Sequence, residues 1–530
     1  MIGFMLLIVL ISCDSNPTKL ESVTGVSLNH TSLTLEVGMS ETLIATVEPS
    51  KAKNHGIIWS SSDEEIATVS ENGEVTAISE GDVIIKVTTI DGSFEAECVI
   101  KAVERIRFTV ANADQWNEAI NFIRENGDDQ IYEINVTSDF SLSGSLDPTF
   151  GNVINVSVRI NGNHIITLIS EGHLLYVNSH QNVIINDTIF EGQDVNVYRL
   201  IMVVGIEAIF TMDGNASVRN NHSGGGISVQ SNATFNLLSG SISGNSLIGY
   251  GPGSISTGAG VILVWDTIFN MSGGTISGNY FLDYTMPTHD RGGGVSNLGG
   301  IFTMTGGEIT GNIAEEGAGV DNSSTATFIM SGGAIYGHTE GYGSGVLSSG
   351  IFILSGGLIY ENYNGGVIAI GNNVFQMSGG KISGNLGGTG SGVSARNFTM
   401  TGGEISENIS RNTGGGVYIT TNGTFKMSGG TIFGNSARRD GGVLLSNNVS
   451  FIFSGGIIYG NEESGAPANL ANKSETTGAS LGIISLDMTG IMYGDGSAIL
   501  LHIDGTYGYT DDTLVGKQWH IQRKLHWRIQ

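Results

Sequence analysis

A repeated template organises the second half of the chain and restricts the folds that the chain can adopt. The clearest copy runs from Phe425 to Asn435: Phe, any residue, Met, Ser, Gly, Gly, any residue, Ile, any two residues, Asn. Copies, some with substitutions, start at Phe210 (with one extra residue), Phe235, Phe269, Phe302, Phe328, Phe352, Phe375, Phe398 and Phe451. Successive starts lie between 23 residues (Phe352 to Phe375) and 34 residues (Phe235 to Phe269) apart. Self-similarity at such a period predicts a repeat architecture.

The residue types of the template predict short strands joined by tight corners. Phe and Met stand two residues apart, so on a strand they face the same side. Ser-Gly-Gly and Gly-Asn supply corners because Gly and Asn tolerate positive φ, and the Ile between them lies on a second strand. Gly-Gly-Gly-Val, as at 292–295, opens a third strand. Three strands per turn predict an all-β parallel β-helix whose turns stack about 4.8 Å apart. The repeats lack the apolar period of about 3.6 residues that helical solenoids require.

Stacked turns bring equivalent residues into columns. Lys381 and Glu404 share the variable position after Gly-Gly in successive copies, so we expect them to lie one strand spacing apart on an outer face. The Asn that ends the template is expected to form an internal ladder, because stacked amides satisfy one another and the corner backbone. Its predicted members are Asn245, Asn279, Asn312, His338, Asn362, Asn385, Asn408, Asn435 and Asn461.

The composition agrees with a folded β protein and disfavours several other classes. The chain has 80 Gly but only 6 Pro, which does not fit the strict triplets of collagen. Hydrophobic residues make up 40% of the chain, enough to exclude wholesale disorder. The net charge of −27 repels phosphate backbones, so we expect no nucleic-acid partner.

The first residues resemble the signal sequence of a bacterial lipoprotein. Residues 2–11 are apolar, too short a run to span a bilayer as a helix but suited to a secretory signal. The next residues complete Leu10-Ile11-Ser12-Cys13, which resembles a lipobox and implies lipidation of Cys13. This predicts a signal peptide at 1–12, a tether at 13–20 and a lipid anchor that holds the chain in the cell envelope, at the outer membrane or cell surface. The alternative is a chance Cys after an ordinary signal peptide, and no Lys or Arg precedes the apolar run.

Residues 21–104 have a different texture, with short alternating runs separated by turn signals, which predicts a β-sandwich. Trp59-Ser-Ser-Ser-Asp63 and Gly73-Glu-Val-Thr-Ala77 are among the segments that resemble the group 2 bacterial Ig-like domain. The resemblance implies a stalk or spacer on a surface protein, with an adhesive role in some members. Trp59 is expected to pack in the core. Cys98, without a disulfide partner if Cys13 is lipidated, is expected to be a small buried residue.

A helix is expected where the solenoid begins. Within residues 113–127, Trp116, Ile120 and Ile123 form one apolar stripe, and Gly127 suits the C-terminal stop. A short amphipathic helix followed by strands resembles the start of pectin-lyase-like β-helices, where it covers the open end of the coil. The resemblance implies a right-handed parallel β-helix over residues 105–503 with a short N-terminal capping helix.

Two insertions and the tail stand apart from the regular repeats. Residues 250–258 and 280–291 lengthen two consecutive turns, and such corner loops often carry function. Residues 504–530 form an unassigned tail that ends rich in basic and aromatic residues. This tail is either a contact for a membrane surface or an anionic polymer, or a truncated or frame-shifted end.

The repeats show no acid–base constellation in their sequence. Hydrolysis of a glycoside requires two carboxylates that face one cleft, and lyase chemistry requires a base with a neutralising cation. Glu308, Lys381 and Glu404 are scattered over variable positions, and His289-Asp290-Arg291, the one compact cluster, is interpreted as a solvated loop. No catalytic, cofactor-binding or metal-binding residue is therefore predicted, and no cofactor.

Two classes of function remain open. The first is a lipid-anchored, surface-exposed, non-catalytic protein that binds a polysaccharide or a host surface protein for adhesion. The whole arrangement resembles that of bacterial surface lipoproteins with a glycine-rich β-helix. The second is a pectin-lyase-like polysaccharide lyase or glycoside hydrolase. At least two acids with Arg, Lys or His on adjacent turns of one face would favour the enzyme, and the repeats are expected to lack such a cluster.

Overall fold

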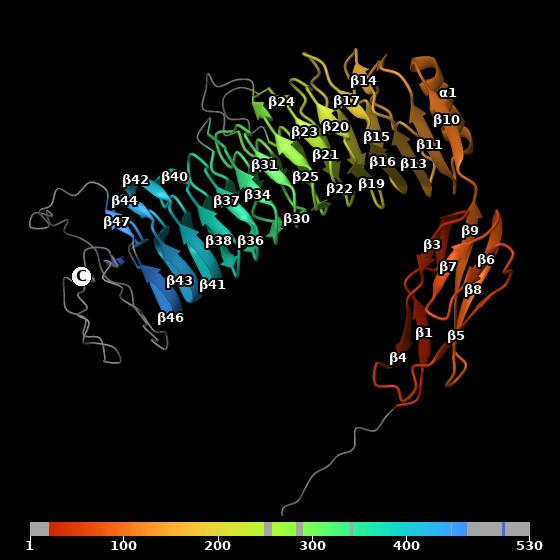
Figure 1. Ribbon diagram of the computed structural model, residues 1–530, viewed down its shortest axis with the longest axis horizontal. Helices are drawn as coiled ribbons and strands as arrows, with labels where there is room; N and C mark the ends of the chain where they lie inside the picture. Colours follow the sequence, from red (N-terminus) through yellow and green to blue (C-terminus); the bar gives the residue numbers. More distant parts are fainter. Residues whose placement is uncertain are drawn as a thin grey trace, which may run out of the picture. The chain divides into compact units, whose positions relative to one another are not determined.

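The computed structural model describes residues 21–248, 257–281, 290–339, 343–446, 448–459, 461–463 and 501–503, and Figure 1 shows its strands and its helix. The chain divides into two compact units. The first runs to Ile106 and includes residues 129–131, and the second contains the rest. Among the described residues, no helix is long and apolar enough to cross a membrane.

The first unit is the predicted β-sandwich. Its four-stranded sheet has the order β2 (Ser32–Glu36), β9 (Glu95–Val103), β8 (Gly81–Thr89) and β5 (Ile57–Ser61). A second sheet has the order β3 (Ser40–Thr42), β7 (Glu74–Ala77) and β6 (Ala67–Val69), and β1 (Gly25–Leu28) pairs with β4 (Ala45–Glu48). Leu43, Val75 and Ile85 are buried in its core, and Trp59 packs against that core as expected. Cys98 is buried and free of disulfides, and burial raises the pKa of its thiol.

The predicted capping helix, α1 (Ala113–Asn126), lies at the N-terminal end of the solenoid (Figure 1). The side chain of Asn112 caps it by accepting a 3.0 Å hydrogen bond from the backbone nitrogen of Gln115. Trp116, Ala119, Ile120 and Ile123 form its buried face. This stripe is the one that the spacing predicts, and it covers the apolar interior at the first turns of the solenoid.

The second unit is a parallel β-solenoid in which each strand pairs with its equivalent one turn later. Strand β10 (Ile106–Val110) leads into it. The Phe ladder consists of β11 (Ile131–Val136), β13 (Val156–Asn161), β16 (Gln181–Asn186), β19 (Ile209–Asp213), β22 (Thr234–Leu237), β26 (Ile268–Met271), β30 (Ile301–Met304), β33 (Thr327–Met330), β36 (Ile351–Leu354), β38 (Val367–Met377), β41 (Val393–Ser406), β43 (Val417–Phe433) and β46 (Ser450–Tyr459). Along it, buried rings stack directly: the centroids of Phe302 and Phe328 lie 4.7 Å apart.

Two further ladders complete each turn. The Ile ladder consists of β12 (Phe140–Leu142), β14 (Ile165–Leu168), β17 (Ile189–Glu191), β20 (Ser217–Arg219), β23 (Ser241–Ser243), β27 (Thr275–Ser277), β31 (Glu308–Thr310), β34 (Ala334–Tyr336), β37 (Leu358–Tyr360), β39 (Lys381–Ser383) and then parts of β41, β43 and β46. The Val ladder consists of β15 (Leu175–Val177), β18 (Ile201–Val204), β21 (Ile227–Gln230), β25 (Val261–Val264), β29 (Val295–Asn297), β32 (Val320–Asn322), β35 (Val346–Ser348), parts of β38, β41 and β43, then β45 (Val443–Leu445) and β48 (Leu501–Ile503).

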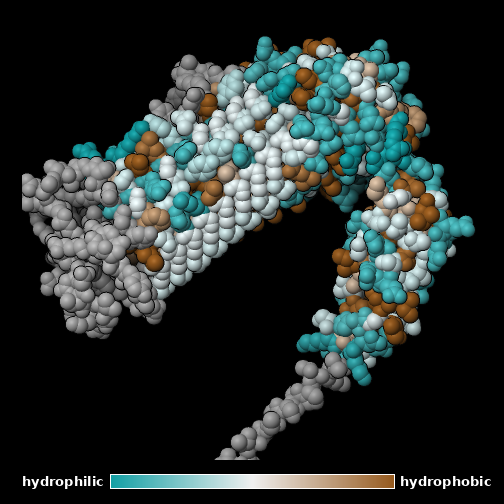
Figure 2. Space-filling view, in the orientation of Figure 1, coloured by the Kyte–Doolittle hydropathy of each residue, from teal (hydrophilic) through white to brown (hydrophobic). Residues whose placement is uncertain are grey.

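Shorter strands pair at one corner: β24 (Ser246–Leu247) with β28 (Tyr280–Phe281), and β40 (Leu386–Thr389), β42 (Ile409–Thr413), β44 (Ser436–Arg439) and β47 (Glu462–Glu463) in series. In the space-filling view, the solenoid surface forms regular rows, pale where residues of intermediate hydropathy recur (Figure 2). The Gly-Gly corners permit this close stacking. At Gly403, φ is 84°, and an added Cβ would lie 2.6 Å from Cε of Met377 in the preceding turn.

The internal Asn ladder is confirmed. Asn385 donates from Nδ2 to Oδ1 of Asn408 (2.9 Å) and to the carbonyl of Ile359 (3.0 Å), and its backbone nitrogen donates to the same Oδ1 (3.0 Å). The predicted members are all buried, and Asn221 extends the column upstream by donating from its backbone to Asn245. Burial lowers the pKa of His338 to about 4, so its ring is neutral in this column at neutral pH.

Candidate functional site

Several residues singled out in the sequence lie outside the described part of the chain. Cys13 and the tail at 504–530 are among them. Of the two inserted loops, the structure describes 257–258, 280–281 and 290–291, and His289 is outside. Within the described ranges, no group of three or more His, Cys, Asp or Glu side chains is placed to hold a metal ion.

Asp290 and Arg291 are not a solvated loop, because they join three other polar residues at one corner of the solenoid. We call Asp290, Arg291, Ser296, Glu316 and Asp321 the corner cluster. Arg291 pairs with Glu316 of the next turn at 2.6 Å, and Ser296 Oγ donates to Asp321 Oδ2 at 3.2 Å. Asp290 and Asp321 are only 2% and 3% exposed. The repeats were expected to lack a cluster of two acids with Arg, Lys or His on adjacent turns. The corner cluster shows that this expectation was wrong.

The cluster is difficult to predict from the sequence because its members come from different parts of adjacent turns. Ser296 and Asp321 are paired neighbours on β29 and β32, while Arg291 and Glu316 pair just before those strands. An alignment of Gly294-Val-Ser with Gly319-Val-Asp would have shown that Asp321 takes the outward position of Ser296. The contact between Ser296 and Asp321 then follows from the strand spacing.

The carboxyl group of Asp321 is strongly perturbed by its surroundings in the corner cluster. Burial raises its pKa to about 6; the nearby Glu316 adds to this shift, while Arg291 and the bond from Ser296 oppose it. A carboxyl with such a pKa can exchange a proton near neutral pH, which is the property of a general acid or base.

A second candidate site lies on the outer face of the Ile ladder. We call Glu308, Tyr336, Tyr360, Lys381, Glu404 and Ser406 the outer strip. They alternate along β31, β34, β37, β39 and β41 with buried Ile residues, so they lie on the outer side of the sheet, where all except the buried Ser406 are at least partly exposed. Strand pairing sets the column Glu308, Ala334, Leu358, Lys381, Glu404 beside the column Thr310, Tyr336, Tyr360, Ser383, Ser406.

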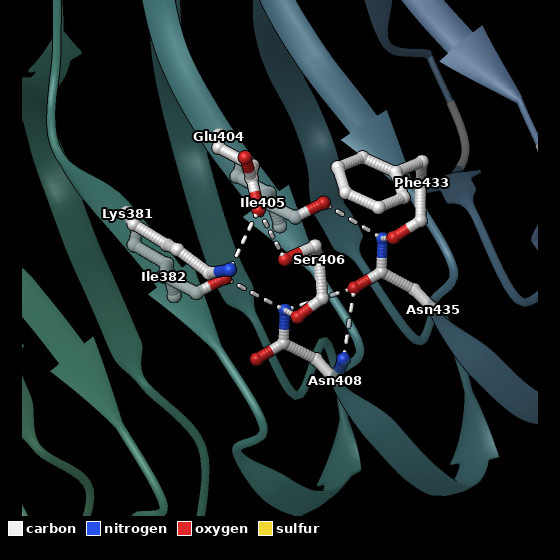
Figure 3. A network of polar contacts seen from close by, with 8 residues as sticks. All are labelled: Lys381, Ile382, Glu404, Ile405, Ser406, Asn408, Phe433 and Asn435. Carbon is white, nitrogen blue, oxygen red and sulfur yellow. Dashed lines mark hydrogen bonds and ion pairs between the residues drawn. The ribbon is translucent and has the colours of Figure 1, made fainter.

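The polar part of the outer strip is the predicted Lys381–Glu404 pair, which is confirmed. Lys381 Nζ lies 2.9 Å from Glu404 Oε1, and Ser406 Oγ donates to the same oxygen at 2.7 Å (Figure 3). Both charged side chains remain exposed by more than a third, at 39% and 34%. Partial burial disfavours the ionised Glu404, but the bonds from Lys381 and Ser406 outweigh it and hold the pKa of this carboxyl below its ordinary value.

The aromatic part of the outer strip was not predicted. The rings of Tyr336 and Tyr360 stack with centroids 4.7 Å apart and planes inclined by 6°. Tyr336 donates its hydroxyl to Glu308 Oε2 at 3.0 Å, and this bond raises the pKa of the phenol. Beyond Tyr360, the column continues with the small Ser383. The signal in the sequence was Tyr at the position after the template Ile in two successive copies, Ile335-Tyr and Ile359-Tyr.

Comparison with known proteins assigns the first unit. Residues 22–100 match the family model "Bacterial Ig-like domain (group 2)". An uncharacterized protein of Clostridium acetobutylicum is 42% identical over 82 residues, which are 15% of this chain and 21% of that protein. An uncharacterized protein of Bacillus cereus is 31% identical over 99 residues, 17% of this chain and 75% of that protein.

A relative with a named activity also matches. A kappa-carrageenase of Pseudoalteromonas carrageenovora is 40% identical over 76 residues, which are 14% of this chain and 19% of that enzyme. The chain thus spans about a fifth of the Clostridium protein and of the carrageenase.

Proposed function

Because this chain belongs to the group 2 bacterial Ig-like family through residues 22–100, we propose that it is a surface protein that binds without catalysing a reaction. Its ligand is a polysaccharide or a protein of another surface, and the outer strip binds it. A lipid on Cys13 anchors the chain in the cell envelope. The observation that carries this proposal is the partly exposed Tyr336–Tyr360 stack, which ends on the strand directly next to the Lys381–Glu404 pair on one sheet face.

The physical basis is preorganisation. Each side chain of the outer strip is fixed by its neighbours in the ladder: Tyr336 by Tyr360 and Glu308, and Lys381 by Glu404. Little side-chain entropy is then lost when a ligand binds. Aromatic rings supply contact area, while a charged pair with spare hydrogen-bonding capacity supplies orientation. This combination suits recognition and requires no reactive group.

The surface location is supported by the first unit, since group 2 bacterial Ig-like domains are typical of extracellular or surface proteins. The anchor is tested separately. Cys13→Ala should release the protein from the membrane fraction or leave its precursor uncleaved. Incorporation of a labelled fatty acid that persists in Cys13→Ala would remove the anchor from the proposal.

The binding role is tested by attachment. The purified chain is applied to glycan arrays and to cells, and Tyr336→Ala and Tyr360→Ala are compared with Tyr418→Ala. Tyr418 lies on the Val ladder, away from the outer strip. Loss of attachment in the two strip variants but not in Tyr418→Ala supports the proposal. Equal attachment by all of them contradicts it.

A second candidate function, glycan cleavage, is favoured by the corner cluster. Asp321, with its raised pKa, lies close enough to Arg291 and Glu316 for their charges to act on it. An acid beside a cation is the minimum that lyase chemistry requires. Pectins, alginates and glycosaminoglycans are incubated with the protein, and unsaturated products and reducing ends are followed. Turnover that Asp321→Asn abolishes would establish this function in place of the first.

A further inference from the structure

We infer that the ligand of the outer strip is an uncharged polysaccharide chain that lies along the solenoid axis, across successive turns. One sugar ring packs on the open face of Tyr360, and neighbouring hydroxyls bind Lys381 and Glu404. This inference rests on the proposed function and narrows its ligand to one chemical class.

The Tyr column has an open end. One face of Tyr360 is covered by Tyr336 at 4.7 Å, but the next two positions of the column are Ser383 and Ser406. Phe433 follows in the turn after these two serines. Ser406 is buried, but the small, partly exposed Ser383 next to Tyr360 leaves room above the backbone for a flat ligand. The C–H face of a pyranose ring buries apolar area against an aromatic face, which favours a sugar over a polar peptide there.

The polar groups beside this opening are arranged for hydroxyls. Lys381 and Ser406 both bond to Oε1 of Glu404, and neither of these bonds uses Oε2. Lys381 carries three donors, of which this pair occupies one. A sugar with two adjacent hydroxyls can therefore donate to Glu404 Oε2 and accept from Lys381 Nζ at the same time. Both groups are partly exposed, so the ligand reaches them without displacing protein.

The charge around the opening selects an uncharged ligand. Lys381 and Glu404 neutralise each other, and no net positive charge remains in the pair to attract a carboxylate or sulfate. Two further acids flank it: Cγ of Glu361 would lie 3.8 Å from a Cβ at Gly384, and Cγ of Glu407 3.7 Å from one at Gly434. The chain as a whole carries a charge of −27. A polyanion is therefore repelled at short and long range.

The direction of the ligand follows from the ladder. The contacts run from Glu308 through Tyr360 to Glu404, one turn at a time, with a step of about 4.8 Å. Along a single turn, the outer strip is only one short strand wide. A ligand that uses both the rings and the charged pair must extend along the axis and repeat, as a polysaccharide chain does.

The test is affinity electrophoresis of the purified full chain in gels that contain one polysaccharide each. The uncharged probes are xylan, mixed-linkage β-glucan and galactomannan, and the anionic probes are polygalacturonate, alginate and chondroitin sulfate. We expect retardation by at least one uncharged probe and by none of the anionic ones. Tyr360→Ala should weaken the apparent Kd at least tenfold, Tyr360→Phe should retain it within about twofold, and Lys381→Ala should weaken it severalfold.

Matched controls separate the outer strip from the rest of the surface. Tyr418→Ala removes a tyrosine from another ladder, and Lys426→Ala removes an exposed lysine from the Phe ladder. Both should bind as the unchanged protein does, and circular dichroism should show that every variant is folded. Retardation by anionic probes alone, or equal binding by Tyr360→Ala, overturns the inference but leaves a binding role intact. No retardation by any probe also overturns it, and attachment to cells then decides the proposed function independently.

Discussion

The same two turns of the solenoid contain two polar pairs with the same distance between their bonded atoms. One pair is buried in the interior and the other lies on the outer surface. Asn385 Nδ2 lies 2.9 Å from Asn408 Oδ1 in the interior, and Lys381 Nζ lies 2.9 Å from Glu404 Oε1 on the outside. The amides are fully buried, while the charged side chains are exposed by more than a third. The distance is identical but the burial is not, and water replaces a lost bond outside but not inside, so we expect the buried pair to contribute more to stability.

This contrast indicates that the interior residues of each turn determine stability, while the exterior residues are free to vary. Interior columns repeat one residue type, such as Phe or Asn, because each turn must fit the one before it. Exterior columns vary from Glu308 to Leu358 to Lys381 without disturbing the stack. We therefore expect substitutions inside to change stability and those outside to change binding, and four substitutions test this division.

Phe328→Ala should have the largest effect. Its buried ring lies between those of Phe302 and Phe352, 4.7 and 4.9 Å away. Truncation leaves a cavity with rigid walls, and we expect a loss of about 3–5 kcal/mol in the free energy of unfolding. Urea unfolding measures it, with the neighbouring outward Thr327→Ala as control. A loss below about 1 kcal/mol would mean that the column collapses around the gap.

Asn408→Ala should cost about 3 kcal/mol. It removes the acceptor for the backbone and side-chain nitrogens of Asn385 and leaves the carbonyl of Ile382 without its amide donor. Each buried group left unsatisfied costs about 1–3 kcal/mol. Asn408→His should cost less, because His338 occupies this column naturally. Equal losses for the two variants in urea unfolding would contradict the role assigned to the amide bonds.

Asp321→Asn should raise stability at pH 7. The folded pKa of Asp321, about 6, exceeds the ordinary value of about 4. The native state therefore binds more protons between these values, and stability falls as pH rises from about 4 to about 6. The difference of about two pKa units corresponds to about 3 kcal/mol as an upper limit. Thermal unfolding from pH 4 to 8 should show that Asn removes this part of the slope. An unchanged slope would show that Asp321 is not its source.

Lys381→Ala should have the smallest effect on stability, no more than about 1 kcal/mol, because the pair is exposed. Lys426→Ala, on a different outer face, should change the midpoint of urea unfolding by a similar small amount. A loss above about 2 kcal/mol for Lys381→Ala alone would break the contrast between interior and exterior.

The sequence predicted what depends on repetition. The spacing of Phe, Ile and Asn indicated the ladders, the buried Asn column and the contact of Lys381 with Glu404. These follow because equivalent positions of neighbouring turns must meet. The apolar stripe of Trp116, Ile120 and Ile123 likewise indicated the capping helix, since its period differs from that of the strands.

The candidate sites were predicted less well because they do not repeat. Arg291 meets Glu316, and Ser296 meets Asp321, only through the pairing of two turns whose lengths differ, and the template does not align the residues just after an insertion. Tyr336 and Tyr360 stack because two copies happen to carry Tyr at the same variable position. Burial of Asp290 depends on the corner that surrounds it, which composition and spacing do not describe.

The pairing of each turn only with its neighbours has a consequence for how the chain changes over generations. An in-frame duplication of one segment, such as the 23 residues between Phe352 and Phe375, inserts a whole turn whose two faces already match those above and below. The solenoid then becomes about 4.8 Å longer along its axis, and no new contact between turns is required. The length of the solenoid is therefore set by the number of repeat copies in the sequence. We expect natural variants of the chain to differ in length by whole turns.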